Sequence, residues 1–128
     1  MAYESPQLSI GTLTAAADLS GKQFYFVKLA SATTVNVCTG VTDVPIGVLQ
    51  NKPTSGQAAE VTFLGISKVS ADATLAAGDV IGTSADSQAQ PLTVGTETTV
   101  YTCGQAITAA SAGETATAFI NISNGRAA

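Results

Sequence analysis

The chain has 128 residues, enough for one domain, and carries five basic and nine acidic side chains for a formal net charge of −4. It contains no His, so the commonest general base is missing and neither a Ser-His-Asp nor a Cys-His arrangement can form. Five scattered cations cannot line a groove for a phosphate backbone, and two Cys do not supply a zinc site, so we expect no enzyme activity, no nucleic-acid partner, no metal and no cofactor.

Small uncharged side chains dominate the remaining composition. Ala accounts for 22 residues and Gly for 12, whereas all charged residues together make up 11%. The mean hydropathy is positive at +0.31, but no segment approaches the ~20 consecutive apolar residues that cross a bilayer, so no membrane partner is expected. We therefore predict a thin core, or one that is shared with another protein.

Residues 1–14 are expected to form an N-terminal arm and a first strand. Pro6 disfavours helix at the residue before it, and Leu8 and Ile10 alternate as in a strand. An acidic residue and a proline stand where a signal peptide has a basic start and an apolar run, so we expect a chain that is made in the cytoplasm and not secreted. The following residues, 15–18, are the best candidate for a short helix.

Residues 15–122 are expected to form a single β-rich domain with mainly antiparallel strands. Alternation and turn residues indicate strands at 23–29, 33–39, 45–51, 59–64, 66–69, 80–83, 91–94, 98–108 and 115–122. The clearest hairpin joins 45–51 to 59–64 through turn residues 52–57, and further turns are expected at Gly78-Asp79, at 84–90 and at 111–114. Residues 123–128 are expected to be a flexible, frayed tail.

One pattern occurs twice along the chain. Gly104 and Gly113 have the same spacing as Gly47 and Gly56, and the residue after the second Gly is Gln57 in one case and Glu114 in the other. Two interpretations stay open. Either the same hairpin occurs twice, or strand, turn and strand match by accident in a chain rich in Ala and Thr.

The acids and the cysteines have structural explanations. Cys38 and Cys103 are too few for a disulfide framework, and a cytoplasmic origin favours free, buried thiols over a pair. Acids next to small or turn-forming residues are expected to bond to local backbone; they are Asp18, Asp43, Asp72, Asp79 and Asp86.

The aromatic cluster of Phe24, Tyr25 and Phe26 has two interpretations. Such a cluster can line a ligand groove, but aromatic side chains dominate buried area and the chain has only seven of them. The sequence therefore favours a place in the core.

The order of the turns and strands adds a resemblance. The chain has an acid-x-Pro-Ile-Gly-Val segment at 43–48, Gly56-Gln57, a Gly-Ile-x-x-Val strand at 65–69, a Leu-x-x-Gly-Asp-Val turn at 75–80, an Asp-centred hairpin at 85–89 and an Ala-Ala-Ser-Ala-Gly-Glu turn from 109. Over residues 20–122 this order resembles the capsid decoration, or cement, proteins of tailed bacteriophages. Ser87 departs from the pattern, because the family hairpin more often has Gly there.

The resemblance implies a small β-barrel or β-sandwich and a structural role in the virion. Such a protein binds the major capsid protein on the outside of the shell, usually as a homotrimer, and stabilises the mature shell by bridging neighbouring capsomers. For the contact with the shell we expect apolar residues of the N-terminal arm: Tyr3, Pro6, Leu8 and Ile10. The alternative is a head-fibre or receptor-binding adhesin module exposed on the virion.

Overall fold

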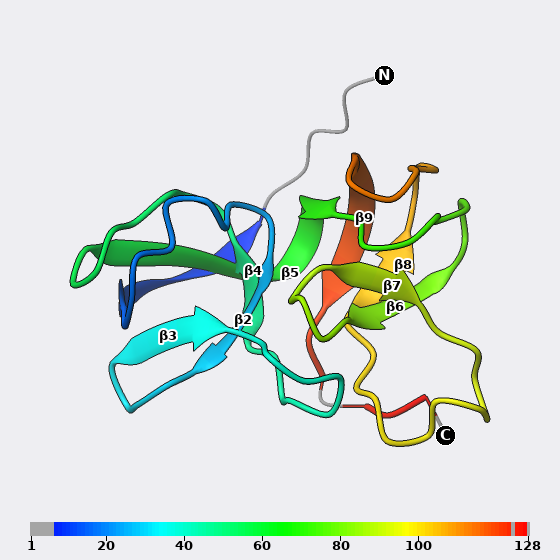
Figure 1. Ribbon diagram of the computed structural model, residues 1–128, viewed down its shortest axis with the longest axis horizontal. Coiled ribbons are helices and arrows are strands. Elements are labelled where there is room, and N and C mark those ends of the chain that lie inside the picture. Colours follow the sequence, from blue (N-terminus) through cyan, green and yellow to red (C-terminus); the bar gives the residue numbers. More distant parts are fainter. Residues whose placement is uncertain (1–6, 124, 128) are drawn as a thin grey trace.

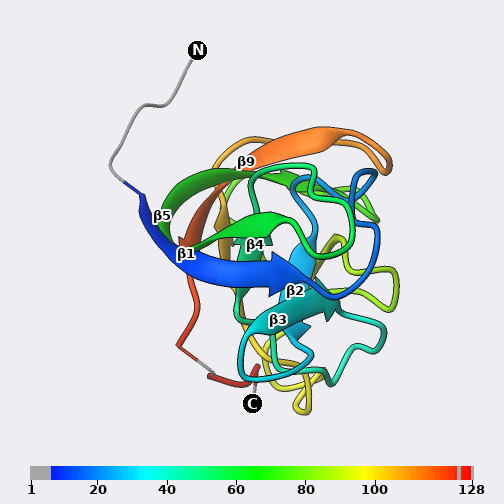
Figure 2. The same ribbon diagram turned by 90° about the vertical axis from the view of Figure 1, so that its left-hand side faces the viewer.

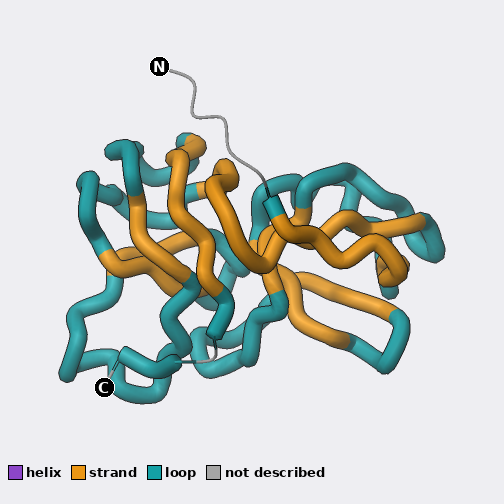
Figure 3. Tube along the Cα trace, turned by 180° about the vertical axis from the view of Figure 1, so that it is seen from behind, coloured by secondary structure: helices purple, strands orange, loops and turns teal. Residues whose placement is uncertain are grey.

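The computed structural model describes residues 7–123 and 125–127, and every regular element in this part of the chain is a strand (Figure 3). The strands are β1 (Leu8–Ala15), β2 (Phe26–Leu29), β3 (Thr34–Val37), β4 (Gly47–Leu49), β5 (Ala58–Ser70), β6 (Val80–Thr83), β7 (Ala89–Pro91), β8 (Gly104–Ala106) and β9 (Thr115–Asn121). The predicted all-β fold is confirmed. Over the same residues, no helix has the length and apolar character to span a membrane.

The strands form two five-stranded barrels that share one long strand. In the first barrel, the order is β1-β3-β2-β4-β5, and a further pairing of β1 with β5 closes the ring. In the second barrel, the order is β5-β9-β8-β6-β7, and a bridge between Ala71 and Ala89 closes it. Figure 1 shows β6 to β9 on one side of the molecule, with β5 between them and β1, while Figure 2 looks onto the first barrel. The strand pairs are antiparallel except β1 with β3, as expected for a mainly antiparallel sheet.

The 13 residues of β5 serve both barrels in turn. Its N-terminal half pairs with β1 and β4, and its C-terminal half pairs with β9. The change occurs at Leu64, which pairs with Leu8 of β1 and with Asn121 of β9. The predicted strand 66–69 is thus not a separate element, because Gly65 continues the strand that begins before it.

The two barrels have the same hydrogen-bond register. Val27 pairs with Gly47 in the first barrel, and Ile81 pairs with Gly104 in the second. The correspondence extends around both rings, so that β2, β3 and β4 match β6, β7 and β8, while the N-terminal half of β5 matches β9. β1 matches the C-terminal half of β5, and both make a parallel bridge to the next strand of the ring. The chain is therefore an internal duplication, and the hairpin that the glycine spacing suggested does occur twice.

Equivalent residues in the two barrels have equivalent contacts. A Cβ at Gly47 would overlap the carbonyl oxygen of Thr62, and a Cβ at Gly104 would overlap that of Phe119, so both positions require glycine. The loops are also alike. The Gln57 Oε1 atom accepts a hydrogen bond from the Thr54 amide at 2.9 Å, and in the second barrel Glu114 does the same for the Ser111 amide at 2.8 Å.

The two barrels have separate cores of unequal bulk. The first barrel is filled by aliphatic side chains, chiefly Leu13, Leu19, Val27, Val35, Leu49 and Val61. In the second barrel alanines take three of these places, with Ala89, Ala106 and Ala118 standing where the first has Val35, Leu49 and Val61. The fully buried Phe26, Cys38 and Val48 of the first barrel belong to this second cluster, so the core of the second barrel is completed by its neighbour.

Two local predictions for the first third of the chain are wrong. Residues 15–18 do not form a helix, because Ala15 ends β1 and the Ala16 amide donates to the carbonyl of Val35. The strand expected from residue 23 begins only at Phe26. Phe24 has a φ of 69° and the Tyr25 amide donates to the Lys22 carbonyl, so a turn precedes the strand.

Two predicted strands in the last third differ from the structure. The strand predicted at 91–94 is displaced, because β7 runs from Ala89 to Pro91 and includes two residues of the predicted turn 84–90. Hydrogen bonding with β6 extends one residue past Pro91, since the Leu92 amide donates to the Val80 carbonyl at 2.8 Å. Only residues 104–106 of the predicted strand 98–108 pair in a ladder.

The frayed tail is also corrected for residues 125–127. The Ala127 amide donates to the Val100 carbonyl at 3.0 Å, and Ala127 itself is buried beside Leu92 and Val100. The Arg126 guanidinium lies 5.0 Å from the centre of the Tyr101 ring. These contacts fasten the C-terminal segment to the 93–102 loop.

Candidate functional site

The structure describes two of the four residues predicted to contact a partner. Leu8 is 52% exposed at the start of β1, and the half-buried Ile10 lies two residues further along the same strand. Tyr3 and Pro6 lie outside the described residues. A register shift in the pairing with β5 lies between Leu8 and Ser9, and of the two residues Ile10 lines a groove.

This apolar groove lies at one end of the first barrel and has a volume of about 510 Å³. Two of its residues, Leu29 and Val44, are 51% and 49% exposed, which is unusual for aliphatic side chains grouped together. Among the residues that the structure describes, its lining contains no charged or polar side chain and consists of Ile10, Leu29, Val44, Pro45, Ile46, Phe63 and Ile122. Such a surface suits contact with an apolar protein surface rather than with a charged ligand.

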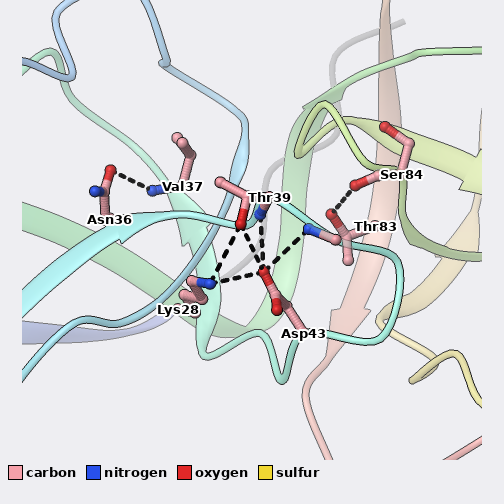
Figure 4. A network of polar contacts seen from close by, with 8 residues as sticks. Lys28, Asn36, Val37, Thr39, Asp43, Thr83 and Ser84 are labelled. Atoms are coloured by element: carbon pink, nitrogen blue, oxygen red, sulfur yellow. Dashed lines mark hydrogen bonds and ion pairs between the residues drawn. The ribbon is translucent and has the colours of Figure 1, made fainter.

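The loop that leads into one wall of the apolar groove is fixed by hydrogen bonds to the carboxylate of Asp43, which Figure 4 shows. Its Oδ2 atom accepts hydrogen bonds from Lys28 Nζ at 2.8 Å, from the Thr39 amide at 2.8 Å and from the Gly40 amide at 3.1 Å. The hydrogen bond from Lys28, followed by that from the Thr39 amide, lowers the pKa of Asp43 below its ordinary value. The carboxylate thereby fixes the loop that leads directly into Val44.

Because the two barrels share one register, groove residues on or next to a strand of the first barrel have equivalent residues in the second barrel. By the shared register, Ile10, Leu29, Ile46 and Phe63 correspond to Ser67, Thr83, Cys103 and Ile120. These four residues of the second barrel are buried, with exposures of 3% or less.

The first barrel covers this end of the second barrel. Its Phe26, Cys38 and Val48 pack in the same cluster as Cys103 and Ile120. A polar contact also links the two barrels here, because Gln50 Nε2 donates a hydrogen bond to Ser67 Oγ at 2.8 Å. The apolar groove is thus the uncovered equivalent of a surface that is covered inside the molecule.

The two cysteines offer no reactive thiol. Cys38 and Cys103 are both free and buried. Burial is the main cause that raises the pKa of Cys38 to about 12, and burial also raises the pKa of Cys103. Within the described part of the chain, no group of three or more Cys, Asp or Glu side chains is placed to hold a metal ion.

The aromatic cluster divides between the core and a polar hollow. Phe26 is fully buried, as the core interpretation predicts, while Phe24 and Tyr25 are half-buried. A hollow of about 350 Å³ lies beside Tyr25 and the 85–88 loop. The Tyr25 hydroxyl accepts a hydrogen bond from Gln88 Nε2 at 2.9 Å, so its polar group already has a partner.

Sequence reasoning missed most of the groove. Leu29, Val44 and Phe63 come from three segments, and only the barrel brings them together. The one available signal was Val44-Pro45-Ile46, an apolar run directly before the glycine that begins the predicted hairpin.

Comparison with known proteins gives a likeness at the level of the fold. No protein-family profile matches the sequence, and no curated protein matches it either. Among solved structures, the chain is similar to the crystal structure of the N base of head fibre gp8.5 in bacteriophage phi29. The TM-score is 0.64 at 20% sequence identity, and the match covers 93% of this chain and 98% of that one. This likeness shows that the two chains share a fold along almost their whole length.

Proposed function

We propose that this chain is a structural protein of a bacteriophage virion that binds the outer surface of the head. The observation that carries the proposal is the shared fold with a head-fibre base, which spans 93% of this chain. The order of turns and strands over residues 20–122 independently resembles phage decoration proteins, which also act on the head.

The chemistry of the side chains agrees with a role in which no bond is made or broken. The cysteines are buried, and the carboxylates of Asp18, Asp43 and Asp79 accept hydrogen bonds from nearby backbone amides. For example, Asp79 Oδ2 accepts a hydrogen bond from the Ala76 amide at 2.9 Å, and Asp18 Oδ1 accepts one from the Ser20 amide at 3.1 Å. What remains exposed for function is apolar surface, which serves protein contacts.

The first form of this role is decoration. A protein that binds the mature shell better than free or immature capsomers stabilises the mature state by linkage. Several weak contacts across neighbouring capsomers, as a homotrimer would make, gain further from effective concentration. We assign the contact with the major capsid protein to the N-terminal segment, with Leu8 as its exposed anchor at 52%.

The second form is the base of a head fibre. It is favoured by the shared fold with the similar structure, which is the N base of such a fibre. In this role the chain also binds the head, but it carries a projecting fibre and need not stabilise the shell.

Co-sedimentation of the protein with purified empty capsids tests the shared part of the proposal. We expect saturable binding, reduced at least about tenfold by Leu8→Asp or by deletion of residues 2–6, because a charge at a buried contact costs several kcal/mol. Thr12→Asp, an exposed change on the same strand, is the matched control and should bind normally. Absence of binding by the intact protein would refute a role on the head.

The two forms are separated by capsid stability and by imaging. A decoration protein raises the melting temperature of the shell as its occupancy rises, and density appears between capsomers. A fibre base leaves the shell melting temperature unchanged, and an extended fibre projects from each bound copy.

A further inference from the structure

We propose that the apolar groove of the first barrel binds the outer face of the second barrel in another copy of this chain. The contact would repeat, between molecules, the contact that the two barrels make within the molecule. It concerns self-association and does not depend on the proposed role on the head.

The internal contact defines the two surfaces that fit one another. The end of the second barrel that contains Ser67, Thr83 and Cys103 is covered by side chains on the outer face of the first barrel. Phe26 of β2 pairs with Val48 of β4, and both belong to the core cluster of the second barrel. The row continues to Thr62 of β5, which pairs with Val48 and whose hydroxyl lies 3.0 Å from that of Ser9. All three residues have an exposure of 0%.

The second barrel carries the equivalent row, here called the outer row, and it is not covered to the same extent. Val80 of β6 pairs with Gln105 of β8, and Gln105 pairs with Phe119 of β9. Phe119 pairs in turn with Ile66, which adds an apolar residue to the row. Phe119 is 43% exposed, Gln105 is exposed and Val80 and Ile66 are half-buried.

The molecule therefore presents both halves of its own internal contact, one on each barrel. The groove at the end of the first barrel is the uncovered counterpart of the covered end of the second. The outer row of the second barrel is the uncovered equivalent of the row on the first barrel that packs against the second barrel. Neither the lining of the groove nor the outer row contains a charged side chain, so docking would bury no unpaired charge.

The symmetry of such a contact follows from its two unlike surfaces. A groove on one copy binds a row on the next, so the contact is head-to-tail and leaves the outer row of the first copy and the groove of the second copy free. Repetition closes into a ring when the rotation between copies allows it and continues as a filament otherwise. A two-fold symmetric dimer is not expected.

The mass of the full chain in solution, measured by sedimentation velocity across a concentration series, tests the proposal. We expect the intact protein to form oligomers. Leu29→Asp in the groove and Phe119→Asp in the outer row should each raise the self-dissociation constant at least about tenfold. Both side chains are largely exposed, so their replacement should leave the circular dichroism spectrum and melting temperature close to those of the parent. Val94→Asp, at a residue that is 61% exposed and outside both surfaces, is the control and should associate normally.

Mixing the two variants provides the sharper test. The Leu29→Asp chain keeps an intact outer row, and the Phe119→Asp chain keeps an intact groove, so one contact forms between them and the mixture should yield a one-to-one dimer. A two-fold contact made by either surface alone would give no such recovery. The proposal is overturned if the intact protein stays monomeric, or if either variant associates like the parent. It is also overturned if Leu29→Asp loses capsid binding at unchanged mass, because the groove would then bind the shell.

Discussion

Phe26→Ala should destabilise the protein by about 3–5 kcal/mol, although the residue lies on the outside of its own barrel. Its side chain is 0% exposed and belongs to the cluster that fills the second barrel, together with Leu75, Ile81, Ile120 and several alanines. Truncation of a fully buried Phe removes its transfer free energy and leaves a cavity, which together give this range. For a domain whose total stability is about 5–15 kcal/mol, that is a large fraction.

The duplication supplies a matched comparison at Val80, the residue equivalent to Phe26 in the second barrel. Val80 is half-buried, so Val80→Ala should cost less than about 1 kcal/mol in dilute monomeric protein. Urea unfolding followed by far-ultraviolet circular dichroism measures both free energies, with equal slopes required for the comparison. Equal costs for the two substitutions would refute the view that the outer row of one barrel completes the core of the other.

Hydrogen exchange locates the effect of Phe26→Ala. We expect faster exchange of amides in β6, β8 and β9 than in β1 and β3, because the lost contact belongs to the second barrel. Leu49→Ala is the control, since Leu49 fills the first barrel and should loosen that barrel instead. Faster exchange confined to the first barrel in both variants would contradict the assignment of Phe26 to the second core.

Three further predictions concern single sites. Asp43→Ala should cost about 1–2 kcal/mol by thermal melting at pH 7, since it removes four hydrogen bonds to a charged group near the surface. Because the folded-state pKa of Asp43 lies below 3.8, this contribution should be present above about pH 4 and disappear as the pH falls through the lowered pKa, so parent and variant converge in acid. Gly104→Ala should cost more than about 2 kcal/mol in urea unfolding, from backbone overlap at a φ of 147°, whereas Gly21→Ala, which meets no atom within 4 Å, should be nearly neutral. Cys38 and Cys103 should resist iodoacetamide at pH 8 in the folded protein and react in urea, because burial disfavours their thiolates; rapid labelling of the folded chain would contradict this.

The sequence predicts those parts of the fold that depend on local alternation and turns. The hairpin between 45–51 and 59–64 and the strand from Thr115 follow from period-two patterns and turn residues, and both are present. The failures have a non-local cause. At 15–18 three alanines suggest helix, but the pairing of Ala15 with Val35 closes a barrel and overrides local preference. At Phe24 the φ of 69° occurs where the second barrel has Gly78, so the turn lacks its usual residue.

The groove was largely hidden because equivalent positions differ in their side chains. Ile46 and Cys103 occupy the same place in the two barrels, as do Leu29 and Thr83, yet neither pair is alike in sequence. The identical pairs, such as Gly47 with Gly104, are required by close backbone packing and do not predict which side chains are exposed. Register is what reveals the relation, and register is a property of the folded chain.

The unequal cores explain why the composition is so poor in large apolar residues. A barrel that receives side chains from a neighbour needs less bulk of its own, and the alanines at 89, 106 and 118 stand where the first barrel has Val35, Leu49 and Val61. Among the described residues 7–123 and 125–127, no such neighbour covers the first barrel, which has both the bulkier interior and an uncovered apolar end. Sharing of a core is thus seen between the two barrels of one chain, and sharing with another protein stays a prediction. Exposure of Leu29 and Val44 in the groove costs solvation free energy in an isolated chain, so we expect a partner to cover the groove. The outer row is the surface equivalent to the one that already covers the corresponding end of the second barrel.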